Sequence, residues 1–97
     1  MKRKNNNDSW GGKWLCGDNT MVGVDLNRNY GFSHGNFGAK EDPCTDIFSG
    51  PFPFSEPETR AMRDFIFKHV NEIKFVYNFH SYGNMFVTPF NALENNM

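Results

Sequence analysis

The 97-residue sequence has no large excess of charge and no long hydrophobic run. Ten lysines and arginines nearly balance eleven aspartates and glutamates, which gives a net charge of −1. That balance argues against a nucleic-acid-binding or membrane-surface protein, and the basic run Lys2-Arg3-Lys4 is too short to indicate one. No apolar run approaches the length that a membrane-spanning helix needs. The charged, Asn-rich stretch after Met1 is not the pattern of a signal peptide.

Cysteine is also scarce, and the length leaves room for only one domain. Cys16 and Cys44 lie far apart in the sequence and match no clustered zinc motif. They form either one disulfide that closes a long loop or two free, partly buried thiols. A disulfide would imply an oxidising compartment, and so an extracellular or lysosomal protein. The sequence leaves this choice open.

Apolar segments on either side of a helical pattern predict an α/β fold. Residues 21–26 form a short apolar run that predicts a buried strand, and residues 75–80 alternate in the manner of a second strand. Residues 31–54 are rich in glycine and proline and predict a long loop. Residues 85–88 indicate the start of another strand, which Pro89 would stop. The order strand, loop, helix, strand is typical of the α/β class.

The predicted helix has a strong start signal. Ser55 is expected to be the N-cap, Pro57 lies in the first turn, and Glu58 completes a capping box. The helix is expected to end near Asn71. Its apolar side chains recur on one side, which predicts a face packed against the rest of the domain.

His80 is placed at the carboxyl end of the second predicted strand and is followed by a turn. In an open α/β sheet, ligand-binding groups collect at that edge. A neutral imidazole there could bind a metal or carry a proton, or it could make one backbone hydrogen bond as an ordinary half-buried histidine. Asn27 and Arg28 follow the first predicted strand, where the planar guanidinium is suited to a carboxylate. The alternative for these two residues is a solvated turn.

Three segments, in this order, resemble the zinc carboxypeptidases of the carboxypeptidase A type, the M14 peptidase family. They are Gly23-Val24-Asp25-Leu26-Asn27-Arg28-Asn29-Tyr30-Gly31, then Asp42-Pro43-Cys44 with Gly50-Pro51-Phe52-Pro53-Phe54-Ser55-Glu56-Pro57-Glu58-Thr59, then Asn78-Phe79-His80-Ser81-Tyr82-Gly83-Asn84. The similarity is clearest over residues 22–97, and Arg3 belongs to a weaker match. The resemblance implies that residues 1–97 are a fragment of a mixed-sheet α/β/α zinc-carboxypeptidase domain (phosphorylase/hydrolase-like).

The resemblance also assigns roles in catalysis. It makes His80 the third protein ligand of a catalytic zinc, with one Zn²⁺ per complete domain. It gives Arg3 the task of stabilising the oxyanion that forms as water attacks the scissile carbonyl. The chemistry agrees, because such a reaction needs a Lewis acid and a nearby positive group.

The remaining implied roles concern the substrate, a peptide or protein C-terminus. Asn27 and Arg28 would hold its terminal carboxylate. Ser81 and Tyr82 would line the subsites next to the zinc. An exopeptidase must recognise a free carboxylate, and an arginine with amide neighbours is suitable for that task.

The sequence lacks two of the zinc ligands and the general base that the resemblance would require. The first two zinc ligands of the family come from a His-x-x-Glu motif well upstream of the Arg3 region, and its general-base glutamate lies well downstream of His80. His34 stands where the family often has tryptophan. We therefore expect a metallocarboxypeptidase that removes the C-terminal residue of peptides when the domain is complete. The 97-residue chain alone is expected to have little or no activity, because catalytic zinc takes three protein ligands.

Two other functions remain open at this point. One is a non-catalytic remnant, or a peptide-binding module that keeps Asn27 and Arg28 for carboxylates but has no metal. The other is a small structural zinc protein, whose ligands would be Cys16, Cys44, His34 and His80. Its ligand spacing is poor.

One further motif, His69-Val70-Asn71-Glu72, spells His-x-x-Glu but falls at the end of the predicted helix. The family's motif instead follows a strand and precedes a helix. We expect His69 and Glu72 to cap the last helical turn rather than to bind zinc.

Overall fold

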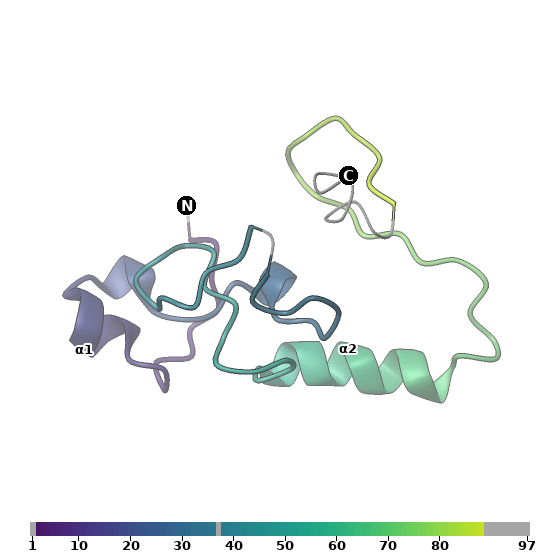
Figure 1. Cartoon of the computed structure of the whole chain (residues 1–97). Helices are drawn as coiled ribbons and strands as arrows, with labels where there is room; N and C mark the ends of the chain where they lie inside the picture. The colour runs from purple at the N-terminus through teal and green to yellow at the C-terminus, as the bar shows by residue number, and fades with distance from the viewer. Residues whose placement is uncertain (1, 37, 89–97) are drawn as a thin grey trace.

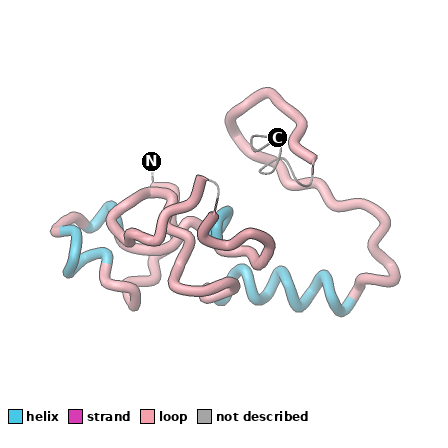
Figure 2. Tube along the Cα trace, in the orientation of Figure 1, coloured by secondary structure: helices cyan, strands magenta, loops and turns pink. Residues whose placement is uncertain are grey.

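The computed structural model describes residues 2–36 and 38–88, which form four helical elements joined by long loops. The elements are α1 (Gly12–Cys16), the 3₁₀ helix η1 (Asn19–Met21), the 3₁₀ helix η2 (Leu26–Arg28) and α2 (Pro57–Lys68). The first three gather with the surrounding loops in one irregular body, and α2 extends away from it (Figure 1). Most of the described chain is loop (Figure 2). No described helix is long and apolar enough to span a membrane.

The predicted strands are wrong for this structure. Residues 21–26, 75–80 and 85–88 contain no strand, and the backbone pairing found in the described ranges is one isolated parallel bridge, Lys40 with Phe48. Pro89 lies outside the described residues. The mixed-sheet α/β class is therefore not confirmed by this structure.

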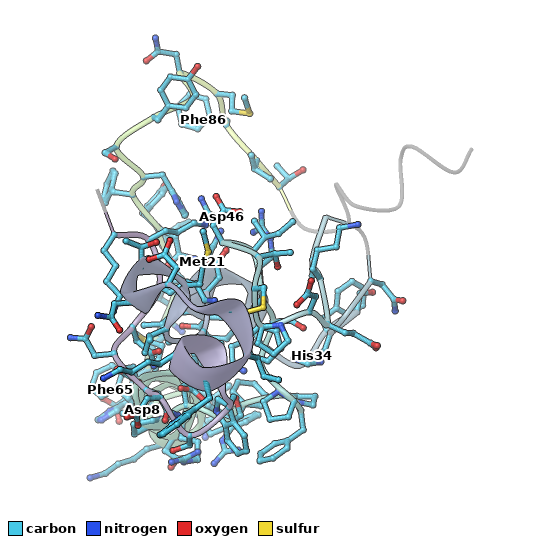
Figure 3. All side chains as sticks on the ribbon, turned by 90° about the vertical axis from the view of Figure 1, so that its left-hand side faces the viewer. Asp8, Met21, His34, Asp46, Phe65 and Phe86 are labelled. Carbon is cyan, nitrogen blue, oxygen red and sulfur yellow. A yellow bond between two sulfur atoms is a disulfide. The ribbon has the colours of Figure 1, made fainter. Side chains whose placement is uncertain are left out.

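The physical reason is that a strand needs a partner. The alternating side chains Phe75, Tyr77 and Phe79 are 80%, 71% and 93% exposed, so the other described residues leave this face largely uncovered. Figure 3 shows Phe86 far from the body of the molecule. An apolar segment without hydrogen-bonding neighbours cannot form a ladder, whatever its β propensity.

Helix α2 forms as predicted but begins one residue later. Glu56, not Ser55, is the N-cap, and its side chain makes no capping hydrogen bond. The amide oxygen of Asn29 instead holds the start of the helix, since Oδ1 accepts from the backbone N–H of the N-cap Glu56 at 3.2 Å and from the hydroxyl of Thr59 at 2.6 Å. Pro57 occupies the first helical position, where its missing N–H costs nothing. The expected capping box therefore gives way to a side chain from a distant loop.

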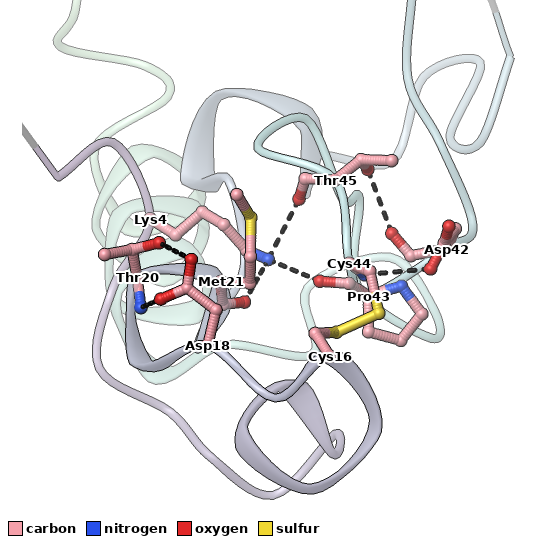
Figure 4. The surroundings of a disulfide bond; sticks show 9 residues. All are labelled: Lys4, Cys16, Asp18, Thr20, Met21, Asp42, Pro43, Cys44 and Thr45. Atoms are coloured by element: carbon pink, nitrogen blue, oxygen red, sulfur yellow. Dashed lines mark hydrogen bonds between the residues drawn. A yellow bond between two sulfur atoms is a disulfide. The ribbon is translucent and has the colours of Figure 1, made fainter.

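The two cysteines form a disulfide. Cys16, at the end of α1, bonds to Cys44 in the long loop (Figure 4). The structural zinc site built on thiolates is therefore wrong, because bonded sulfurs are not available as thiolate ligands. The bridge fixes a loop that has little regular structure of its own.

A lysine ammonium lies beside this bridge. Lys4 is 6% exposed, and its Nζ donates to the carbonyls of Met21 at 2.5 Å, Pro43 at 2.7 Å and Thr45 at 2.9 Å. Two of these carbonyls flank Cys44. Burial lowers the pKa of Lys4, while the nearby carboxylates of the loop raise it less. The ammonium therefore ties the N-terminal segment to the disulfide-bonded loop.

The interior is more polar than apolar. The buried hydrophobic side chains in the described ranges are Val22, Val24 and Phe48. The buried polar residues are more numerous: Lys4, Asp25, Asn29, Ser49, Ser55, Glu56 and Thr59. Every buried side-chain nitrogen and oxygen in the described part has a hydrogen-bond partner. The body is therefore organised by a satisfied polar network rather than by a large apolar core.

Candidate carboxylate-binding and metal-ligand site

Asn27 and Arg28 lie on the short helix η2, which a buried carboxylate holds in place. Asp25 is the N-cap of η2, and its Oδ1 accepts from the backbone N–H of Asn27 at 3.1 Å. The backbone N–H of Arg28 donates to the carbonyl of Asp25 at 2.9 Å. Aspartate at an N-cap satisfies a backbone donor that the helix itself leaves unpaired. The two predicted substrate-binding residues are thus presented on a rigid turn.

The same carboxylate holds Arg3. The guanidinium Nε donates to Oδ2 of Asp25 at 2.7 Å, with the Arg3 side chain 45% exposed and that of Asp25 only 3%. One buried carboxylate therefore connects the predicted oxyanion group to the predicted carboxylate-binding turn. The prediction from sequence did not identify Asp25, although its position within the run that resembles the family was a signal.

Arg28 is half-buried, and two of its guanidinium nitrogens donate to backbone carbonyls. Its Nε donates to the carbonyl of Gly38 at 3.1 Å, and its Nη1 donates to the carbonyl of Asn27 at 3.3 Å. Its Nη2 makes no hydrogen bond to the described residues. Arg28 and His34 line one small cleft, of about 170 Å³. A ring nitrogen of His34 lies 2.8 Å from the carbonyl oxygen of Ser49, so this histidine is engaged by the loop.

A second groove brings the two main predicted sites together. It has a volume of about 410 Å³. Its lining residues are Leu26, Asn27, Tyr30, Tyr77, Asn78, Phe79 and His80. The predicted carboxylate-binding amide and the predicted metal ligand therefore face one space, although a long stretch of sequence separates them.

The other predicted residues lie apart from this groove. Arg3 lines a different cavity, of about 440 Å³, together with Lys2 and Lys4. Ser81 and Tyr82 are exposed, Tyr82 by 96%, and neither lines the groove. The structure thus unites Asn27 with His80 but does not bring Arg3, Ser81 or Tyr82 to the same space.

Comparison with known proteins assigns this chain to a family. The profile of the zinc carboxypeptidase family, Peptidase_M14, matches residues 1–96. This chain belongs to the zinc carboxypeptidase family. The resemblance noted in the three sequence segments is confirmed.

Individual zinc carboxypeptidases match over much of this chain. Mast cell carboxypeptidase A of Rattus norvegicus is 41% identical over 73 residues, which are 75% of this chain and 18% of that protein. Carboxypeptidase B of Astacus astacus is 45% identical over 67 residues, or 69% of this chain and 22% of that protein. The chain therefore spans about a fifth of the length of these curated relatives.

Solved structures agree with the family assignment. A crystal structure of thrombin activatable fibrinolysis inhibitor has a TM-score of 0.52 and 41% sequence identity, over 55% of this chain and 14% of that one. The bovine protein, in complex with tick carboxypeptidase inhibitor, has a TM-score of 0.50 and 39% identity, over 52% of this chain and 17% of that one. The similarity thus covers about half of this chain.

Membership of the zinc carboxypeptidase family implies zinc in a complete domain, but the described residues do not make a zinc site. Among them, no group of three or more histidine, cysteine, aspartate or glutamate side chains could hold a metal. His80 is one exposed imidazole, whereas catalytic zinc takes three protein ligands. The described residues therefore do not hold the ion by themselves.

The His69–Glu72 motif lies where the helix pattern placed it. His69 is the C-cap of α2, and its backbone N–H donates to the carbonyls of Phe65 and Ile66. Its Nδ1 lies 3.6 Å from a carboxylate oxygen of the exposed Glu72. This pair belongs to the end of the helix, and neither residue lines the groove that holds His80.

The prediction from sequence also missed Glu56, a carboxylate with no exposed surface. Burial raises its pKa, but hydrogen bonds from Asn5, Asn7, Ser55 and Trp10 outweigh burial and lower the pKa below its usual value of 4.5. From the sequence alone, a glutamate directly before a helix is expected to be exposed to solvent. Three of its four donors, Asn5, Asn7 and Trp10, come from a segment far away in the sequence, so no local pattern signalled it.

We expect Glu56 to make stability depend on pH in the acidic range. Because its folded pKa is depressed, the unfolded chain binds more protons between that pKa and 4.5, and stability rises with pH there. The contribution is present above 4.5 and is lost as the pH falls through the folded pKa. Urea midpoints measured from about pH 3 to about pH 6 should change less in Glu56→Gln than in the native chain. If the urea midpoint depended on pH equally in the two proteins, Glu56 would not be the source of this pH dependence.

Proposed function

We propose that this chain is part of the catalytic domain of a metallocarboxypeptidase, which removes the C-terminal residue of peptides and proteins by zinc-dependent hydrolysis. The observation that carries the proposal is the groove shared by Asn27 and His80, next to the partly unoccupied guanidinium of Arg28. Family membership supports the reaction class. The activity belongs to the complete domain, since this chain contributes one of three metal ligands.

Recognition of the substrate is assigned to the η2 turn. Arg28 has its Nε and Nη1 on backbone carbonyls, which fixes the guanidinium plane and leaves Nη2 for an incoming carboxylate. The exposed Asn27 adds an amide donor beside it. A charged donor and a neutral donor on one rigid turn suit a terminal carboxylate. Asn27 lines both the small cleft that Arg28 lines and the groove that His80 lines, so it connects the two.

Further roles are assigned to three residues that do not line this groove in the structure. Arg3, oriented by Asp25, would stabilise the oxyanion, and Ser81 and Tyr82 would line the subsites beside the metal. The disulfide supports an oxidising, extracellular or lysosomal compartment for the protein.

The test compares ligands that differ in one group. The protein in its full-length form is titrated with an N-acetylated dipeptide that ends in a free acid and with the same dipeptide amidated. We expect the acid to bind about 30-fold more tightly, in line with about 2 kcal/mol for a charged hydrogen bond. Arg28→Met should remove most of this preference, because the amidated ligand never used it.

A matched variant guards against general effects of losing an arginine. Arg63→Met removes a half-buried guanidinium from α2, where Arg63 contacts Asp64 and the ring of Phe54 rather than the groove. It should keep the full preference for the acid. Equal binding of acid and amide by the native protein would refute the carboxylate site.

A second candidate is a carboxylate-binding module that works without metal. The observation in its favour is that Asn27 and Arg28 present their donors on η2 through contacts that need no metal. The two functions are separated by adding zinc to the full-length protein and following hydrolysis of the peptide acid. Selective binding with no zinc-dependent turnover would favour the module. Robust zinc-dependent turnover by the 97-residue chain alone would contradict the view that one ligand is insufficient.

A further inference from the structure

Glu56 is a buried carboxylate with no cationic partner in the described residues. It has no exposed surface, and each of its oxygens accepts two hydrogen bonds. The donors are Asn5 Nδ2 at 2.8 Å and Asn7 Nδ2 at 2.7 Å to Oε1, and Trp10 Nε1 at 3.0 Å and Ser55 Oγ at 2.7 Å to Oε2. All four donors are neutral. The negative charge is therefore solvated by fixed protein dipoles instead of by water.

The side-chain amide of Asn29 forms a second buried centre. Asn29 also has no exposed surface. Its Nδ2 donates to Ser49 O at 2.8 Å, Phe52 O at 3.3 Å and Ser55 Oγ at 2.8 Å, and its Oδ1 accepts from Glu56 N at 3.2 Å and Thr59 Oγ1 at 2.6 Å. Asn29 directly follows Arg28. Its position therefore constrains the backbone that carries the proposed carboxylate-binding guanidinium.

The hydroxyl of Ser55 joins the two centres. It accepts from Asn29 Nδ2 at 2.8 Å and donates to Glu56 Oε2 at 2.7 Å, so one proton position satisfies both partners. Asn29, Ser55 and Glu56 thus form one continuous hydrogen-bonded chain. Ser55, which the sequence suggested as a helix cap, instead serves as this connection.

The other end of the chain reaches Arg3 through Asn5. The amide nitrogen of Asn5 donates to Glu56, while its Oδ1 accepts from the backbone N–H of Val24 at 2.8 Å. The backbone N–H of Asn5 donates to the carbonyl of Val24 at 3.0 Å. Asn5 is therefore held on three sides, two residues after Arg3. The segment that presents Arg3 is fixed by the same carboxylate that fixes the loop after Arg28.

We propose that Glu56 is a positioning residue, which sets Arg28 relative to Arg3 through Ser55 and Asn29 on one side and Asn5 on the other. The inference rests on the proposed function, because it concerns the two arginines that would hold substrate and oxyanion. A buried charge is a weak way to add stability, since apolar replacements are often as stable. What it adds is a fixed arrangement of donors from separate segments.

The ion pair of Arg3 with Asp25 does not make this network redundant. Asp25 contacts the Arg3 guanidinium and the backbone N–H of Asn27, so it orients one side chain against the start of the turn. The Glu56 network instead fixes the backbones on both sides. Guanidinium orientation and backbone position are separate requirements for a substrate that both arginines must contact.

The test removes the connection while it keeps the carboxylate. In the full-length protein, Ser55→Ala deletes the hydroxyl between Asn29 and Glu56 and leaves three donors to the carboxylate. The matched control is Ser49→Ala, which deletes another buried hydroxyl, whose partners are the carbonyls of Lys40 and Gly50. We expect Ser55→Ala to raise KM for a peptide acid about tenfold, because small displacements of positioned groups cost up to about 100-fold in rate. Ser49→Ala should leave KM within about twofold.

The Michaelis constant is the decisive readout because it does not depend on the fraction of protein that is folded. A purely structural role would lower the apparent kcat and leave KM unchanged. Unchanged KM in Ser55→Ala would overturn the inference. If Ser55→Ala does not fold at all, Ser55→Cys gives the same readout, since it keeps nearly the size of the side chain and replaces the hydroxyl between Asn29 and Glu56 by a weakly hydrogen-bonding thiol.

Failure of this inference differs from failure of the proposed function. If Arg28→Met leaves the preference for peptide acids intact, the proposed function fails, and the inference fails with it. If Arg28→Met removes that preference but Ser55→Ala and Ser49→Ala have the same KM, only the positioning role of Glu56 is wrong.

Discussion

Replacing Glu56 by alanine is expected to lower the free energy of unfolding by about 3 kcal/mol or more. Its carboxylate accepts from Asn5, Asn7, Trp10 and Ser55, so its loss leaves four donors in a buried space without an acceptor. Each buried donor left unpaired costs about 1–3 kcal/mol, and local relaxation recovers part of the sum. Urea unfolding followed by tryptophan fluorescence measures this loss.

Glu58→Ala is the matched control for this change. Glu58 lies two residues further along, is exposed, and receives only a long contact of 3.4 Å from Asn5. Its replacement should change the free energy of unfolding by less than about 0.5 kcal/mol. Similar losses in the two variants would show that the Glu56 network does not organise the body.

Removal of the disulfide is expected to have an effect of comparable size. The double variant Cys16→Ala, Cys44→Ala should lower the free energy of unfolding by about 3–4 kcal/mol, because the bridge closes a loop with a sequence separation of 28 residues. The loop also supplies two of the three carbonyls that hold the ammonium of Lys4. Without the bridge, that buried cation has fewer fixed partners.

The measurement is the urea midpoint of the double variant and of the native protein, each with and without reductant. Reductant should lower the midpoint of the native protein to that of the double variant and should not affect the double variant itself. A native protein whose midpoint does not respond to complete reduction would contradict the assigned role of the bridge.

Helix α2 could be predicted from the sequence because its start depends mainly on residues that are close together in the chain. Helix α2 has Pro57 at its first position and ends at Lys68, close to the predicted boundaries. The shift of its N-cap from Ser55 to Glu56 has a non-local cause, because the acceptor is Asn29. A capping box is a pattern within four residues, and it cannot show that a distant amide will bind the backbone N–H and the hydroxyl at the start of the helix.

The strands show the opposite case. The alternation around Phe75, Tyr77 and Phe79 describes a surface suited to a sheet, but a ladder needs neighbouring strands that the described residues do not provide. The alternation of apolar and polar residues in a sequence indicates how a segment could pack, but it does not indicate whether a neighbouring strand is present. The same limit applies to the apolar face of α2, where Met62 and Phe65 remain exposed.

The sequence named residues for the candidate site, whose roles stay a prediction, but it did not indicate the residues that hold them in place. Asn27, Arg28 and His80 were identified from residue types and from the resemblance to a family, and the structure places Asn27 and His80 on one groove. Asp25, Asn29 and Glu56 were missed, because nothing local distinguishes a buried polar residue from a solvated one. Their partners are contributed by segments that only the folded chain brings together.

The most direct test of the central claim is the sequence of the full-length message that encodes these 97 residues. A catalytic domain of the zinc carboxypeptidase family predicts an in-frame His-x-x-Glu upstream of Arg3 and a glutamate that serves as general base downstream of His80. Their presence would complete the ligand set to which His80 is assigned. A message whose open reading frame lacks both would contradict the catalytic function and would leave carboxylate binding at Arg28 as the activity to test.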